Sequence, residues 1–108
     1  MTVWVLAVGR PGRLLAPAIA EYERRAARYW KLETIEVREA RGAGDPDRVR
    51  ATESARLLAR APAGAELVAL TRTGRAWDSL ELADYLGRLA AAGHPGPAFL
   101  IGGAYGLA

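Results

Sequence analysis

The sequence predicts an α/β protein with a mainly parallel sheet and flanking helices, and two observations lead to this prediction. Short apolar or β-branched runs alternate along the chain with segments in which apolar residues recur at helical spacing. Each connection between successive expected strands is long enough to hold a helix, as parallel strands require. The alternation spans the whole chain without a repeat or a linker, so we expect one domain over residues 1–108.

Strands and helices are expected in strict alternation. In the second strand polar and apolar residues alternate, which puts Ile35 and Val37 on one face and Thr34 and Glu36 on the other. One face of this strand is therefore expected to meet solvent, as at the edge of a sheet. In chain order the expected elements are strand 2–8, helix 13–30, strand 31–38, helix 46–60, strand 66–71, helix 79–92 and strand 97–101.

Capping residues mark the starts of the second and third helices. Asp45 before Pro46 supplies an N-cap and a proline at the first helical position, where no amide hydrogen is needed. Asp78 and Ser79 cap the third helix, and Glu81, three residues after Asp78, completes a capping box. These residues predict where the two helices begin without reference to the apolar pattern.

The composition excludes several classes of protein. The chain has 51% hydrophobic and 25% charged residues, which is typical of a globular domain rather than a disordered chain. It has no cysteine, so disulfides, thiolate metal sites, iron–sulfur clusters and cysteine nucleophiles are excluded. No apolar run approaches the roughly 20 residues of a membrane span, and the first residues lack the basic region of a signal peptide. We therefore expect a soluble, cytoplasmic protein that binds neither a metal nor a membrane.

Positive charge is concentrated in the first half of the chain. Residues 1–60 hold 12 basic and 8 acidic side chains, whereas residues 61–108 hold 3 and 4. This excess favours a polyanionic partner for the first half. A group of arginines on the first helix is open to two interpretations, a solvated face with acidic partners or contacts to RNA phosphates. They are Arg24, Arg25 and Arg28.

Glycines follow the carboxyl ends of three expected strands, where ligands bind in open parallel sheets. There a glycine lets the backbone approach a ligand closely or adopt a positive φ. The pattern indicates a nucleotide-like ligand held by main-chain groups, although turns between strands and helices also use glycine for their own geometry. Neither a dinucleotide-binding motif nor a phosphate-loop motif is present. The glycines are Gly9, Gly12, Gly74, Gly102, Gly103 and Gly106.

Side chains suited to acid–base or nucleophilic catalysis are scarce. The single histidine, His94, lies in the turn that leads into the fourth strand, at the opposite end of the sheet from the glycines, and is interpreted as a turn residue. No Ser-His-Asp set can be assembled around it. Trp77 is interpreted as a packing residue before the third helix rather than a platform for base stacking. The residues alone therefore leave the catalytic groups unknown.

Several separated segments of the chain match one family pattern in order from end to end. The most specific is the glycine-rich segment 99–107, Phe-Leu-Ile-Gly-Gly-Ala-Tyr-Gly-Leu. The other matching positions are Glu21, Tyr22, Arg25, residues 31–37, Glu53, residues 68–70, Gly74, Ser79 and Ala83. Together they resemble the RlmH family, SPOUT-class methyltransferases that act on N3 of a pseudouridine in 23S ribosomal RNA of the large ribosomal subunit.

The resemblance implies an S-adenosylmethionine-dependent enzyme that acts on 23S rRNA as a homodimer and has the SPOUT-like α/β knot fold. It implies cofactor contacts at Leu70, Gly102 and Gly103 and assigns no catalytic residue. In the family a helix, a strand and a knotted tail follow the glycine-rich segment. The resemblance therefore implies that the 108-residue chain alone lacks the knot-forming part and is weakly active or inactive.

Two other classes of function remain open from the residues. The first is a non-catalytic α/β module that binds rRNA or the ribosome through the positive first half, with binding that weakens steeply as salt rises. The second is a flavodoxin-like protein that binds a small ligand at the glycines. Binding of a methyl donor or of a flavin would separate these possibilities from the methyltransferase.

Overall fold

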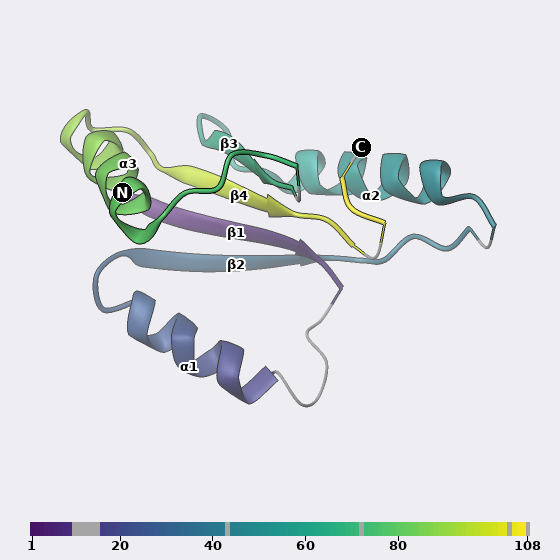
Figure 1. Cartoon of the computed structure of the whole chain (residues 1–108), viewed down its shortest axis with the longest axis horizontal. Helices are drawn as coiled ribbons and strands as arrows, with labels where there is room; N and C mark the ends of the chain where they lie inside the picture. Colours follow the sequence, from purple (N-terminus) through teal and green to yellow (C-terminus); the bar gives the residue numbers. More distant parts are fainter. Residues whose placement is uncertain (10–15, 43, 72, 104, 108) are drawn as a thin grey trace.

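The computed structural model describes residues 1–9, 16–42, 44–71, 73–103 and 105–107, and it confirms the α/β prediction. Strands and helices alternate strictly along the chain (Figure 1). No helix among these residues is long and apolar enough to cross a membrane. The elements are β1 (Thr2–Val8), α1 (Ala16–Ala26), β2 (Lys31–Val37), α2 (Pro46–Arg60), β3 (Glu66–Leu70), α3 (Ser79–Ala91) and β4 (Pro97–Ile101).

The four strands form one sheet in the order β2-β1-β4-β3, and every neighbouring pair is parallel. Leu6 of β1 pairs with Ile35 of β2 on one side and with Leu100 of β4 on the other. The predicted edge position of β2 is confirmed, and β3 forms the opposite edge. Because all strands are parallel, their carboxyl ends lie at one edge of the sheet (Figure 1).

The strand order decides which face each helix covers. The connections from β1 to β2 and from β3 to β4 cross the sheet in one direction, and the connection from β2 to β3 crosses it in the other. Since crossovers between parallel strands are right-handed, α1 and α3 lie on one face and α2 on the opposite face. Two hollows agree with this placement. Val5 of β1 lines one hollow together with residues of α1, and it lines a second hollow together with Leu82 of α3.

The core lies between α2 and the sheet. Leu57 of α2 and Leu6 of β1 are completely buried, and the core residues around them are also on the α2 side of the sheet. The face covered by α1 and α3 is packed less densely, since α3 contains no buried residue. Leu70 and Ile101 on that face are 49% and 38% exposed. The sheet therefore has one closed face and one partly open apolar face.

The first helix is shorter than its apolar pattern predicts. It ends at Ala26, whereas the spacing predicts a helix to residue 30; the expected residues 13–15 lie outside the described part of the chain. The amides of Arg28 and Tyr29 donate to carbonyls three residues earlier, those of Arg25 and Ala26. These tighter hydrogen bonds end the helix because the chain must turn at once into β2.

The predicted N-caps are confirmed, but the capping box of α3 is only half formed. The Asp78 side chain accepts from the Glu81 amide at 2.8 Å, and Asp45 accepts from the Arg48 amide at 3.2 Å. The carboxylate of Glu81, which the motif would direct back to the helix start, instead pairs with Arg75. A guanidinium in reach is a stronger partner for a carboxylate than a backbone amide, so the box is left incomplete.

We expect Asp78→Ala to lower the free energy of unfolding by about 1 kcal/mol, because it removes the acceptor for the first-turn amide of α3. Asp78→Asn keeps a side-chain oxygen at the cap and should change stability by less than half of that amount. Urea denaturation of both variants measures the difference. Equal losses would show that the charge of Asp78, rather than its hydrogen bond, stabilises the helix.

Candidate functional site

The segment after β4 folds back on itself at the carboxyl edge of the sheet. The amide of Gly106 donates to the carbonyl of Gly103 at 3.0 Å, and the two residues form an isolated antiparallel bridge. A Cβ atom on Gly102 would lie 2.5 Å from the carbonyl carbon of Gly106 and 2.9 Å from the amide nitrogen of Leu107. These neighbours are backbone atoms that cannot rotate away, so the closed loop requires glycine at position 102.

A buried carboxylate lies against the same loop from the α2 side. Glu53 is only 3% exposed, and its Oε2 accepts a hydrogen bond from the Ala40 amide at 3.0 Å. Its Oε1 has no hydrogen-bond partner among the described residues. A Cβ atom on Gly103 would lie 2.7 Å from this Oε1. Glu53 therefore joins the segment after β2 to the glycine loop after β4.

Glu53 was not predicted as a site residue, although the sequence carries a signal for it. Val49, Glu53 and Leu57 recur every four residues along α2, and all three are buried. A carboxylate within an apolar stripe of a helix must be buried with it, and burial of an unpaired charge is strongly unfavourable. Such a position is a candidate for a specific role.

Leu70, the last residue of β3, borders a hollow on the partly open face of the sheet. Leu70 pairs in register with Ile101, the residue before Gly102, so the structure places the ends of β3 and β4 side by side. The hollow has a volume of about 590 Å³ and mostly apolar walls, with Thr71, Arg75 and Trp77 among its lining residues. Gly102 and Gly103 are not among its lining residues.

The three expected cofactor contacts therefore divide between two faces. Leu70 lines the hollow on the face of α1 and α3. Gly103 contacts Glu53 and Val8 on the face of α2, and Gly102 packs against the returning backbone between them. All three lie at the carboxyl edge, as expected, but a single ligand reaches them together only by spanning the end of β4.

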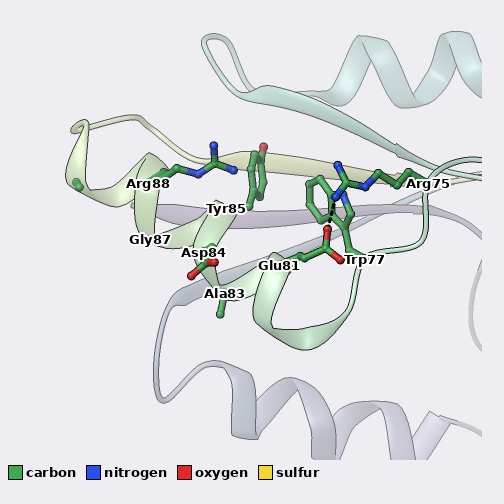
Figure 2. Close-up of a pocket in the computed structure, with 9 residues that line it drawn as sticks. Arg75, Trp77, Glu81, Ala83, Asp84, Tyr85, Gly87 and Arg88 are labelled. Carbon is green, nitrogen blue, oxygen red and sulfur yellow. Dashed lines mark hydrogen bonds and ion pairs between the residues drawn. The ribbon is translucent and has the colours of Figure 1, made fainter.

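A second hollow lies along α3 and is built from paired groups. Trp77 and Tyr85 pack with ring centroids 4.9 Å apart, and Arg75 forms an ion pair with Glu81 (Figure 2). The hydroxyl of Tyr85 donates to Glu66. Burial, and then this bond to a carboxylate, raises the pKa of Tyr85. The phenol stays protonated at neutral pH, so Tyr85 keeps its hydrogen bond to Glu66 and is not a general base.

His94, Arg24 and Arg25 have structural partners. His94 accepts a hydrogen bond from the Gly96 amide at 2.9 Å, in the turn before β4, as its interpretation as a turn residue expects. Arg24 and Arg25 both pair with Glu21 on exposed α1, which favours a solvated face over phosphate contacts for these two. Gly12 lies outside the described residues.

An all-parallel sheet with a closed glycine loop and an apolar hollow at its carboxyl edge is the arrangement of α/β proteins that bind a nucleotide-like ligand. The family model described as "Predicted SPOUT methyltransferase" matches residues 1–108. The chain belongs to this family of SPOUT methyltransferases, which confirms the α/β fold class and the methyltransferase activity that the resemblance implied. A methyltransferase requires a methyl donor.

Curated relatives match the chain over nearly all of its length. The "Ribosomal RNA large subunit methyltransferase H" of Gemmatimonas aurantiaca is 45% identical over 109 residues, which cover 99% of this chain and 70% of the relative. The protein of the same name from Rubrobacter xylanophilus is 46% identical over 110 residues, which cover 96% of this chain and 68% of the relative. That from Anaeromyxobacter sp. is 39% identical over 108 residues, covering 99% and 70%. The similarity to RlmH proteins is thus confirmed along the whole chain.

Proposed function

We propose that this chain is an S-adenosylmethionine-dependent methyltransferase that acts on N3 of a pseudouridine in 23S rRNA of the large ribosomal subunit. The observation that carries the proposal is the joint presence of a closed glycine loop and an apolar hollow at adjacent strand ends, in a member of the SPOUT family. The names of the relatives supply the substrate. As in the resemblance, we propose a cytoplasmic homodimer with one domain over residues 1–108.

The residues at the carboxyl edge fit the proposed cofactor in size and polarity. The hollow beside Leu70 has a volume of about 590 Å³, which lies within the range of roughly 300–1,000 Å³ typical of small-molecule sites. Its apolar walls suit the purine and the methylene groups of the cofactor, and Thr71 can donate or accept a hydrogen bond at its rim. We propose that Leu70 contacts the cofactor there and that Gly102 and Gly103 contact it through their main chain.

The contribution of this chain to methyl transfer is alignment. S-adenosylmethionine, when bound, supplies an electrophilic methyl group on a sulfonium. The glycine loop presents backbone groups from a fixed position, because Gly106 closes it and Glu53 packs against it. Holding two reactants in line can supply about 7–11 kcal/mol of the barrier reduction. Such a mechanism depends on the shape of the loop more than on a single acid or base.

Calorimetry with S-adenosylmethionine tests the cofactor site. We expect saturable binding that is competed by S-adenosylhomocysteine. The variant Leu70→Glu should lose at least tenfold in affinity for S-adenosylmethionine, about 1.4 kcal/mol, because a charge enters the apolar hollow. Leu67→Glu is the matched control, since Leu67 is equally exposed, 48% against 49%, and does not line the hollow.

Two outcomes would count against the proposal. Absence of S-adenosylmethionine binding would contradict the proposed cofactor. Equal losses of affinity in the two leucine variants would contradict the hollow as the cofactor site. Transfer of a labelled methyl group to 23S rRNA, followed by nucleoside analysis for N3-methylpseudouridine, tests the substrate. RNA binding that weakens with salt, with neither binding of S-adenosylmethionine nor methyl transfer, would favour the non-catalytic module instead.

A further inference from the structure

A cluster of three arginines lies at the carboxyl edge of the sheet, between the segment after β2 and the helix α2. Arg38, Arg41 and Arg56 line one hollow of about 550 Å³. None of the three forms an ion pair with any residue that the structure describes, whereas Arg24, Arg50 and Arg75, among others, do. We call these residues the arginine cluster. Among the described residues, no ion pair neutralises its positive charge.

One carboxylate, that of Glu39, lies in the lining of this hollow, and its side chain lies beside Gly9. Glu39 packs over Gly9 at the end of β1, where a Cβ atom on the glycine would lie 2.5 Å from its Oε1. The charged groups of the lining are three guanidiniums and one carboxylate. The lining of this hollow therefore carries a net positive charge, which attracts a polyanion.

Two side chains of α2 fix the backbone that carries the cluster. Arg56 donates from Nη1 to the carbonyl of Arg38 at 2.9 Å. Glu53 accepts from the amide of Ala40 at 3.0 Å. The segment from residue 38 to residue 41 is therefore held at two points, so its arginines meet a ligand with less loss of conformational freedom than on a free loop.

The topology puts this cluster where open parallel sheets bind ligands. The chain leaves β1 toward α1 on one face and leaves β2 toward α2 on the other. Ligands bind in the crevice between adjacent strand ends that diverge in this way. The same edge carries the segment that follows β4 (Figure 1). Glu53 accepts a hydrogen bond from the segment after β2 and lies against Gly103.

We propose that Arg38, Arg41 and Arg56 bind the phosphate backbone of the RNA substrate and direct it toward the glycine loop. The inference rests on the proposed function, which makes RNA the substrate. A guanidinium matches a phosphate with two parallel hydrogen bonds, and three neighbouring guanidiniums without an ion pair among the described residues suit the successive phosphates of a backbone. The positive first half of the sequence thus acts through the cluster and not through Arg24 and Arg25 of α1.

Fluorescence anisotropy with a labelled RNA hairpin tests the proposal. The double variant Arg38→Gln/Arg41→Gln removes two contacts and leaves Arg56 to hold the segment. We expect affinity to fall about 15- to 30-fold at physiological salt, and the dependence of log K on log salt to become shallower by about 1.5. The matched control, Arg24→Gln/Arg25→Gln, removes the same charge from the paired arginines of α1. Its affinity for the RNA hairpin should fall less than threefold.

Three results would overturn the proposal: no RNA binding by the chain, equal losses in both double variants, or competition by polyglutamate as effective as by unlabelled RNA. The last would assign the cluster to an acidic protein surface. Calorimetry with S-adenosylmethionine separates this inference from the proposed function. If the chain binds RNA through the arginine cluster but does not bind S-adenosylmethionine, the RNA-binding role of the cluster stands and the proposed methyltransferase function is rejected. If the chain binds S-adenosylmethionine but the arginine substitutions do not change RNA affinity, the proposed function stands and the role of the cluster is rejected.

Discussion

Gly102→Ala is expected to weaken methyl-donor binding at least tenfold and to lower the free energy of unfolding by about 1–3 kcal/mol. The new Cβ would lie 2.5 Å from the Gly106 carbonyl carbon and 2.7 Å from its oxygen. Because both are backbone atoms, the collision is relieved only by opening the loop that Gly103 and Gly106 close. The donor would then lose the main-chain groups proposed to hold it. Calorimetry and urea denaturation measure the two effects.

Gly87→Ala is the matched control for this variant. It makes the same substitution within α3, where a Cβ atom would meet nothing within 4 Å. Alanine is favoured over glycine inside a helix, so this variant should gain about 0.5–1 kcal/mol and bind the donor normally. Normal binding by Gly102→Ala would show that the closed loop is not part of the donor site.

Glu53→Ala is expected to lower the free energy of unfolding by about 1–3 kcal/mol and to weaken donor binding with it. The change leaves the Ala40 amide without its acceptor and removes the side chain against which Gly103 packs. Two segments at the carboxyl edge lose their common support, so the damage should extend beyond stability. Hydrogen exchange at the amides of both segments, measured beside urea denaturation, reports whether they open together.

Glu53→Gln keeps the shape and the acceptor and removes only the charge. Its amide oxygen can accept from Ala40, and the charged oxygen that has no partner among the described residues is replaced by a neutral group. We expect stability within about 1 kcal/mol of the unchanged protein, or above it. If glutamine were as damaging as alanine, the charge itself would be needed, which would place a cationic partner beside Oε1.

Much of the fold could be predicted from local pattern. The strands 2–8 and 97–101 were predicted at their observed bounds, and the start of α2 after Asp45 followed from one capping residue and one proline. These features depend on neighbouring residues alone. The end of α1 could not be predicted in this way. The turn after Ala26 is set by the entry of the chain into β2, and the spacing of apolar residues carries no information about that turn.

The site was predicted less completely than the fold. Leu70, Gly102 and Gly103 were placed correctly at the carboxyl edge, although their contact with the cofactor stays a prediction. Glu53 went unnoticed as a site residue because its significance lies in a contact with residues 13 and 50 positions away. The residues of the arginine cluster likewise come from two segments that only the packing of α2 brings together.

The sequence by itself determined the alternation of strands and helices, the parallel sheet and the glycines at the strand ends, because periodicity, capping and turn chemistry act over a few residues. It also determined the excess of positive charge in residues 1–60. Only the tertiary structure decided the order β2-β1-β4-β3, the burial of Glu53 against Gly103, and which arginines remain unpaired among the described residues. The physical reason is that pairing and burial depend on which distant segments the fold brings into contact, and local pattern does not specify that.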